Sequence, residues 1–327
     1  MLKPAPYSNG GDTATTTRAL ADIGRWLQSQ RYAFVTVTPA THAAVLHNRP
    51  TAAAGLRDVF GWSLPFEPRL LPADMLDVMQ GADLLETCEG GRFRSAVRFS
   101  TLGDLMLPHS AFPTVQSESV FFGPDTYRFA ALIRRELRTQ PLAPQSRLLD
   151  VGCGTGAGGL VAAKCAGPAA AELVLSDISA TALQFAQASV AVAGVAGVRF
   201  TQSDLFHGLE GDFDLIVANP PYLNDGAERL YRHGGGQWGE GLSLRILREG
   251  FPRLSPGGRL VLYTGSAIVN GVDPLGDALR AHLATHGGDW TYEEIDPDVF
   301  GEELQSPAYA GVDRIAAVSL VVRKPSP

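Results

Sequence analysis

The run Asn219-Pro220-Pro221-Tyr222 combines residue types that can hold a planar nitrogen, and it directly follows the mostly apolar segment Phe213–Ala218. An Asn side chain can accept a hydrogen from such a nitrogen, and the prolines fix backbone carbonyls so that they point into a pocket. The Tyr222 ring offers a flat face to a planar group. Taken alone, however, two prolines after a strand indicate a rigid turn. The chemistry of this run therefore depends on what lies beside it.

A glycine-rich loop lies upstream, where the apolar segment Arg147–Val151 runs into Gly152, Gly154 and Gly156. Glycine is needed where the chain turns sharply and a ligand approaches the backbone closely. The alternate spacing differs from the Gly-x-Gly-x-x-Gly fingerprint of dinucleotide-binding proteins, which weakens a nicotinamide interpretation.

Two acidic residues follow the next two predicted strands. Asp177 ends the strand that begins at Glu172, and Asp204 comes shortly after a strand over residues 198–201. A carboxylate at the first position can accept from both ribose hydroxyls of a nucleoside. The second carboxylate is placed to meet an adenine amino group. Each acid alone is typical of a helix cap, but the order and spacing of loop and acids together favour a nucleoside site.

These residues need a scaffold that brings strand ends together, and the second part of the chain predicts one. Strands and helices alternate from Arg147 onward, which specifies an α/β fold with a doubly wound, mostly parallel sheet. Ligands bind such sheets beyond the carboxyl ends of the strands, at the switch point. The predicted elements are strands 147–151, 172–176, 197–201, 213–218 and 258–264 and helices 157–166, 179–193 and 241–253.

Residues 1–118 read as a smaller α+β domain, with a winged-helix shape as one interpretation. Gly123-Pro124 breaks the structure and a helix over 127–137 follows, so a second domain is predicted over residues 119–327. The elements expected in the first domain are helices 15–30, 39–46, 52–60 and 72–80 and strands 83–88, 93–99 and 102–108.

The amino-acid composition limits which partners and which cellular compartment can be expected. The 45% of hydrophobic residues can fill a sizeable core, and the formal net charge of −7 argues against electrostatic attraction of nucleic acid by the whole molecule. Arg92, Arg94 and Arg98 alternate along a predicted strand, which favours a solvated face over a phosphate-binding track.

The cysteines Cys88, Cys153 and Cys165 have no spacing typical of zinc sites or disulfides, so reduced thiols in a cytoplasmic protein are expected. No secretory signal is predicted in residues 1–17, and no membrane span is predicted. His282 and His286 are spaced for one helix face but lack a third ligand, so no metal is expected.

The segment from Asp150 to Gly156 resembles the first motif of the class I S-adenosylmethionine-dependent methyltransferases. The resemblance implies a seven-stranded sheet that finishes with an antiparallel pair, here 290–295 and 314–322, and S-adenosylmethionine as the cofactor. It also implies a segment folded over the cofactor, although an ordinary helix cap explains Asp125 and Thr126 equally well. The implied cofactor contacts are Asp150, Gly152, Gly154, Thr155, Gly156, Asp177, Asp204, Leu205, Asn219, Asp125 and Thr126.

The four residues Asn219–Tyr222 fall where methyltransferases acting on amino and amide groups carry this motif, which implies catalytic roles for Asn219, Pro220 and Tyr222. The following Gly234-Gly235, Gly241-Leu242 and Arg245 are similar to the release-factor glutamine methyltransferases. A protein glutamine is therefore the expected methyl acceptor.

Three departures from that group keep other acceptors open. The chain has Gly239-Glu240-Gly241 in place of Asp-Gly, and its fifth strand ends in Tyr263-Thr264-Gly265 in place of Glu-x-Gly. Residues 1–118 do not resemble the usual small helical domain. The alternatives are an adenine or guanine amino group in RNA or DNA and a small molecule or peptide. A cofactor-binding scaffold without catalysis is disfavoured, because the acceptor motif is intact.

Overall fold

The computed structural model describes residues 13–49, 51–114, 116–286 and 288–326. It divides into two compact units. The first unit ends at Tyr127 but also takes in Gly154–Gly156 and Thr181–Ala196, and the second contains the remaining segments from Arg128 onward. The boundary predicted between residues 118 and 119 stays a prediction. The prediction for a secretory signal concerns residues 1–17, of which 1–12 lie outside the described residues.

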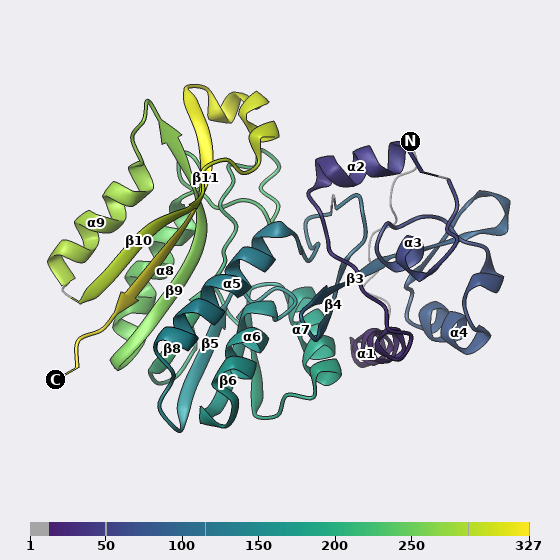
Figure 1. The fold of residues 1–327 in the computed structure, drawn as a ribbon, viewed down its shortest axis with the longest axis horizontal. Helices are drawn as coiled ribbons and strands as arrows, with labels where there is room; N and C mark the ends of the chain where they lie inside the picture. Colours follow the sequence, from purple (N-terminus) through teal and green to yellow (C-terminus); the bar gives the residue numbers. More distant parts are fainter. Residues whose placement is uncertain (1–12, 50, 115, 287, 327) are drawn as a thin grey trace. The chain divides into compact units, whose positions relative to one another are not determined.

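The second unit is built on a seven-stranded sheet with the order β10-β11-β9-β8-β5-β6-β7 (Figure 1). The neighbours from β9 to β7 are parallel, whereas β11 is antiparallel to both β9 and β10. This confirms the predicted doubly wound, mostly parallel sheet with an antiparallel finish. The strands are β5 (Ser146–Val151), β6 (Ala170–Asp177), β7 (Val198–Gln202), β8 (Phe213–Ala218), β9 (Leu254–Val269), β10 (Asp289–Asp296) and β11 (Val312–Arg323).

Helices cover both faces of this sheet, because alternate residues of each strand point to opposite sides. On one face, Gly159 of α6 (Ala157–Ala166) lies so close to Leu175 that a Cβ atom would come within 2.4 Å of that side chain. On the other face, α8 (Gly241–Gly250) and α9 (Pro274–His286) share a core with the sheet. The predicted end of α8 at residue 253 is three residues late, because residues 251–253 form a 3-10 turn.

The first unit contains mostly short helices and two small antiparallel sheets, β1–β2 and β3–β4. Leu20, Ile23 and Leu27 form the fully buried stripe of α1 and pack in one core with Phe60 and Phe99. The elements are α1 (Thr13–Ser29), α2 (Pro39–His47), α3 (Leu56–Phe60), α4 (Ala73–Gly81), β1 (Leu85–Thr87), β2 (Phe93–Ser95), β3 (Val97–Leu102), β4 (Leu105–Ser110), α5 (Pro124–Thr139), which continues into the second unit, and α7 (Ala180–Ala193). Its short 3-10 turns are η1 (Pro68–Leu70) and η2 (Glu89–Gly91). Those of the second unit are η3 (Gly167–Ala169), η4 (Phe251–Arg253), η5 (Gly301–Gln305) and η6 (Pro307–Tyr309).

Three predicted elements of the first unit are wrong in extent, and one of them, the strand over residues 102–108, spans the turn at Gly103-Asp104 between β3 and β4. The single strand expected over residues 93–99 is divided at Ala96 into β2 and β3, which belong to different sheets. The Ser95 hydroxyl donates to the Val97 carbonyl at 2.7 Å and accepts from the Val97 amide, so local bonds replace the ladder there. The helix expected over residues 52–60 begins only at Leu56, because the Ala53 amide donates to the Pro65 carbonyl. The winged-helix interpretation stays a prediction.

Arg98 does not lie on a solvated face as predicted. Its side chain is 5% exposed, and its Nε donates to the Ser110 carbonyl at 3.0 Å. Burial lowers the pKa of Arg98 to about 10. The alternation of Arg92, Arg94 and Arg98 was misleading, since the division of the strand at Ala96 separates Arg98 from the other two.

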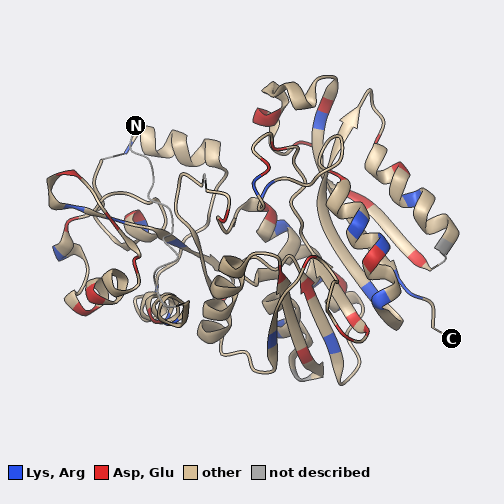
Figure 2. Cartoon of the chain, turned by 180° about the vertical axis from the view of Figure 1, so that it is seen from behind, with Lys and Arg blue, Asp and Glu red and all other residues tan. Residues whose placement is uncertain are grey.

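Charged residues of both signs occur throughout the described part of the chain. Basic and acidic residues are interspersed over its helices and strands (Figure 2). None of the helices described here is both long and apolar enough to cross a lipid bilayer.

Candidate active site

The register of the sheet places three of the predicted site residues at one level. Val151 of β5 pairs with Ser176 of β6 and with Ala218 of β8. The residues that follow these three are Gly152, Asp177 and Asn219, so they lie next to one another at the carboxyl edge of the parallel strands. The chain runs from β5 to β6 and β7 on one side and to β8 and β9 on the other. This edge is therefore the switch point at which open α/β sheets bind ligands.

The glycine loop after β5 leaves its backbone open. Gly152 and Gly154 have φ values of 66° and 53°, and a Cβ atom at either position would meet nothing within 4 Å. A ligand can therefore approach this backbone closely. The Thr155 hydroxyl instead donates to the Pro108 carbonyl at 2.6 Å and lies 3.0 Å from the Ser189 hydroxyl. Because that hydroxyl already has protein partners, its contact with a cofactor stays a prediction.

Asp150 lies beneath this loop and holds the start of α6. Its side chain is 2% exposed, and its Oδ2 accepts the Gly159 amide at 2.7 Å. Burial is the main cause that raises the pKa of Asp150 to about 7; the nearby Asp177 adds to this effect and the Gly159 hydrogen bond opposes it. The carboxyl group therefore takes up charge only near neutral pH.

This environment predicts a pH-dependent effect of Asp150→Asn. In the unfolded chain Asp150 loses its proton near pH 4, whereas in the folded chain it keeps the proton to about pH 7. The free energy of unfolding should therefore fall as pH rises through this window, by about 2–4 kcal/mol from this group. Denaturant unfolding at pH 4 and 7.5 checks this: the variant should lack that part of the fall. An equal difference between variant and wild type at both pH values would contradict the assignment.

The two predicted nucleoside-binding acids have different surroundings. Asp177 is half-buried, and its Oδ1 accepts the Ser179 amide at 2.9 Å in a local turn. The Asp204 side chain is 55% exposed, and the Arg245 Nη2 lies 3.4 Å from both of its carboxylate oxygens. Such an exposed pair contributes little to stability. Leu205 has a φ of 51°, so this loop keeps a left-handed conformation that an apolar side chain rarely adopts.

The acceptor motif is packed against glycines that leave no room for a side chain. Asn219 is half-buried at the end of β8, whereas Tyr222 is 7% exposed. A Cβ atom on Gly265 of β9 would lie 2.2 Å from the Tyr222 ring, and one on Gly239 would lie 2.1 Å from the Tyr222 carbonyl oxygen. These positions therefore require glycine. In the sequence, Gly265 was noted only as the last residue of Tyr263-Thr264-Gly265, and its packing role was missed.

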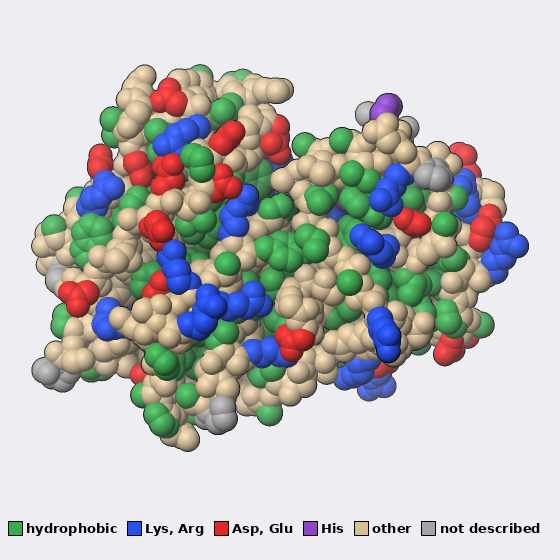
Figure 3. Space-filling model, viewed as in Figure 1, with side chains coloured by type: hydrophobic (Ala, Val, Ile, Leu, Met, Phe, Trp, Pro, Cys, Tyr) green, Lys and Arg blue, Asp and Glu red, His purple; other side chains and the backbone are tan. Residues whose placement is uncertain are grey.

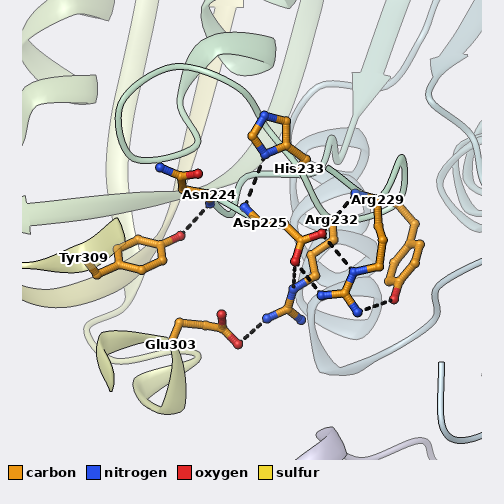
Figure 4. A network of polar contacts seen from close by, with 8 residues as sticks. Asn224, Asp225, Arg229, Arg232, His233, Glu303 and Tyr309 are labelled. Atoms are coloured by element: carbon orange, nitrogen blue, oxygen red, sulfur yellow. Dashed lines mark hydrogen bonds and ion pairs between the residues drawn. The ribbon is translucent and has the colours of Figure 1, made fainter. Parts of the chain in front are cut away.

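A network of charged side chains holds the loop that follows the motif (Figure 4). Asp225 is 7% exposed, and its Oδ2 accepts the Arg229 amide at 3.0 Å and Nε at 2.8 Å. The Nε of Arg232 lies 3.4 Å from the other oxygen of this carboxylate. Hydrogen bonds from Arg229 lower the pKa of Asp225 to about 2. The carboxylate therefore stays charged at neutral pH. Sequence reasoning did not find this network, although an Asp followed by two Arg in a long loop was a usable signal.

Asp125 and Thr126 belong to the first unit, where both side chains are buried. The Thr126 hydroxyl accepts the Gly123 amide at 3.4 Å, and the Thr126 amide donates to the Gly123 carbonyl at 3.0 Å. This is the arrangement of a helix start. Their contact with a cofactor stays a prediction.

The cysteines and histidines add no second centre in the described part of the chain. It contains no group of three or more His, Cys, Asp and Glu residues that could hold a metal ion. His282 is half-buried on α9, and the side chain of His286 lies outside the described residues. Cys153 is buried, which raises the pKa of its thiol well above the usual value.

Comparisons with known proteins agree with this geometry. Residues 128–268 match the methyltransferase small domain family. A release factor glutamine methyltransferase from Deinococcus radiodurans is 36% identical over 191 residues, covering 55% of this chain and 63% of that protein. A ribosomal RNA small subunit methyltransferase C from Haemophilus influenzae is 28% identical over 177 residues, covering 53% and 48%. The chain thus matches less than two thirds of either relative's length.

Among solved structures, a tRNA m1G37 methyltransferase from M. jannaschii aligns with a TM-score of 0.48 at 12% identity, over 71% of this chain and 58% of that chain. The strand order comes from the fold and the family match comes from the sequence, and both point to a methyltransferase sheet. Residues 128–268 are thus similar to the methyltransferase small domain family, and the chain resembles class I S-adenosylmethionine-dependent methyltransferases such as the release factor glutamine methyltransferases.

Proposed function

We propose that this protein binds S-adenosylmethionine and transfers its methyl group to the side-chain nitrogen of a protein glutamine. One observation carries the proposal: the register of β5, β6 and β8 sets Gly152, Asp177 and Asn219 side by side. A backbone open to a ligand, a carboxylate for ribose and an amide for a planar nitrogen then share one edge of the sheet. The family match over residues 128–268 supports this interpretation.

The residues present fit the cofactor. Gly152 and Gly154 leave open space above their backbone, and the half-buried Asp177 can accept hydrogen bonds from ribose hydroxyls. When bound, the cofactor supplies a methyl group on a positively charged sulfur, which departs as a neutral thioether. The protein therefore has little need of an acid at the leaving group. Its main contribution is to align the acceptor nitrogen with the methyl carbon and to exclude water.

The acceptor motif supplies that alignment. In the proposed complex, Asn219 Oδ1 and the Pro220 carbonyl accept the two hydrogens of the glutamine amide, and Tyr222 packs beside the planar group. The nitrogen lone pair is then held toward the methyl carbon. A bound cofactor would supply the methyl carbon, and its sulfur would keep the electron pair of the broken carbon–sulfur bond, while Asn219 and Pro220 hold the nitrogen that takes the methyl group. The nitrogen loses one proton to water after the transfer, so no strong base is required.

The surface charge favours a protein acceptor over a nucleic acid. The connection between β10 and β11 and the strand end before it carry acidic side chains, which gather on the face shown in Figure 3. Of these, Glu294, Asp296 and Glu303 pair with Arg314, Arg128 and Arg232, and the exposed Asp298 and Glu302 carry negative charge outside those pairs. Carboxylates repel a phosphate backbone. A base in ribosomal RNA is the second candidate acceptor, since the relative from Haemophilus influenzae is a ribosomal RNA methyltransferase.

Asp177→Ala is expected to weaken binding of S-adenosylmethionine by about 1–3 kcal/mol, because ribose hydroxyls lose a charged acceptor. The matched variant is Asp177→Asn, which can still accept the Ser179 amide but lacks the charge. Isothermal titration calorimetry on both variants separates the two roles. Weaker binding of S-adenosylmethionine by both variants supports a contact between the Asp177 carboxylate and ribose. Wild-type affinity of Asp177→Asn would mean that Asp177 only holds the local turn.

The proposed function is tested by incubating the protein with methyl-labelled S-adenosylmethionine and a bacterial lysate, with and without ribonuclease. We expect the label to stay in protein after ribonuclease treatment. Label that disappears with ribonuclease would select the RNA base instead, and no labelled macromolecule in either sample would contradict both candidates.

A further inference from the structure

The connection between β10 and β11, residues 297–311, lies against the chain that follows the acceptor motif. All of these residues belong to the second unit. Contacts from Phe300, Glu303 and Tyr309 reach the segment from Tyr222 to Arg232. We refer to residues 297–311 as the clamp loop. The clamp loop is separated from the motif in sequence by more than the length of a βαβ unit. Its contacts with the motif therefore arise from the fold and not from neighbouring positions in the chain.

The first contact comes from a residue with a strained backbone. Phe300 has φ 54° and ψ 38°, a left-handed conformation that is uncommon for a bulky side chain. Its ring meets the Tyr222 ring edge to face, with a centroid distance of 5.9 Å and an angle of 71° between the rings. The Val299 amide donates to the Ile315 carbonyl at 2.8 Å and ties the loop to β11 next to Phe300. The surrounding structure thus imposes the conformation that sets the Phe300 ring against the motif.

The second contact is a buried hydroxyl. Tyr309 is 2% exposed, and its hydroxyl oxygen accepts the backbone amide of Asn224 at 2.7 Å. The Asn224 side chain in turn donates to the Gln237 carbonyl at 2.8 Å. Tyr309 therefore fixes a peptide unit two residues beyond Tyr222 and, through Asn224, the glycine-rich segment on the other side of the motif.

The third contact links charges. The Arg232 guanidinium donates to Glu303 of the clamp loop, and it also faces Asp225 at the start of the charged network (Figure 4). The Leu223 amide donates to the Arg232 carbonyl at 3.1 Å, so the backbone beside the motif is bonded to the same arginine residue. The three contacts differ in kind, yet they converge on residues 222–225.

We propose that the clamp loop positions Asn219 for methyl transfer by fixing the backbone of residues 222–225, with Tyr309 and Glu303 as positioning residues. This inference rests on the proposed function of the same site. Neither residue touches the reacting atoms. Loss of either contact should leave the cofactor site intact and let the acceptor motif move. Small displacements of a positioning group lower the rate of the chemical step much more than they lower binding.

The test compares Tyr309→Phe and Glu303→Gln with Tyr292→Phe as the matched control. Tyr292→Phe also removes a hydroxyl hydrogen bond in the second unit, the one of 2.6 Å to Asp273. Tyr292 lies on β10 and not in the clamp loop, and this bond does not reach the acceptor motif. Three quantities are measured on the full chain: hydrogen exchange of residues 219–241 by mass spectrometry, the dissociation constant of S-adenosylmethionine, and kcat and KM with a purified bacterial release factor.

We expect exchange over residues 219–241 to rise at least about threefold in both clamp-loop variants and to stay unchanged in the control. Their kcat should fall by about 5- to 50-fold, with KM and cofactor affinity changed by less than about twofold. Unchanged hydrogen exchange over residues 219–241 in both variants would contradict the proposal that the clamp loop fixes this segment. Raised exchange with an unchanged kcat would overturn its positioning role. Absence of transfer by the wild type with this substrate would instead overturn the proposed acceptor, while the exchange data would still decide whether the clamp holds the segment.

Discussion

Asn219→Ala is expected to lower the rate of methyl transfer at least about 100-fold, because the acceptor nitrogen loses the group that orients its lone pair. The affinity for S-adenosylmethionine should change by less than about twofold, since Asp177 and the glycine loop remain. Asn219 follows Ala218 at the end of β8 and is only half-buried, so its truncation leaves the sheet pairing intact. Single-turnover transfer and calorimetry measure the two effects separately.

The variant Asn219→Asp refines this prediction. It keeps the size and an oxygen acceptor but loses the amide hydrogens, so it should retain more activity than the alanine variant if Oδ1 is the working atom. Transfer at the wild-type rate by Asn219→Ala would remove this residue from the mechanism.

The second large effect is expected from Gly239→Ala. A Cβ atom there would lie 2.1 Å from the Tyr222 carbonyl oxygen and 2.5 Å from its carbon, and the φ of 102° is unfavourable for alanine. Because these contacts are with backbone, a side-chain rotation cannot relieve them. The acceptor motif must shift, so we expect a loss of at least about 10-fold in kcat and of about 1–3 kcal/mol in the free energy of unfolding.

The matched control is Gly226→Ala in the same loop. Gly226 is exposed, and a Cβ atom there would meet nothing within 4 Å. Its replacement should change the free energy of unfolding by no more than about 0.5 kcal/mol and leave kcat unchanged. Equal activities of the two variants would show that the close packing of Gly239 on Tyr222 has no bearing on transfer.

The scaffold of the site was predictable because its signals are local. Apolar strands such as Phe213–Ala218 are short and bounded by polar residues, and alternation with helices specifies parallel pairing. Parallel pairing then brings strand ends to one edge, which is why Gly152, Asp177 and Asn219 could be grouped before the fold was known. The antiparallel finish of β10 and β11 was predicted from the resemblance and is confirmed.

Features that depend on tertiary packing were not predictable in the same way. The alternation over residues 93–99 fits one strand, but the bonds of Ser95 divide it, and Arg98 is buried as a result. The alternation of apolar and polar residues indicates which side of a strand each residue faces, but it does not indicate where the hydrogen-bond ladder of that strand ends.

The residues that pack on the acceptor motif were also missed, for a different reason. Gly265 and Tyr309 are far along the chain from Tyr222 and Asn224, and no spacing rule joins them. A glycine in a strand did carry a signal, since it marks a place where another group approaches closely. The contact that explains it is visible only in the folded chain.

The central claim is that the amide at Asn219 presents a glutamine nitrogen to a methyl donor bound along the edge of Gly152 and Asp177. Its most direct test is to incubate the wild type with S-adenosylmethionine and a purified bacterial release factor, and to locate any added methyl group by tandem mass spectrometry. We expect one methyl group on the side-chain nitrogen of a glutamine, absent with Asn219→Ala. A methyl group found only on another residue type, or only on small-subunit ribosomal RNA supplied in a parallel reaction, would contradict it.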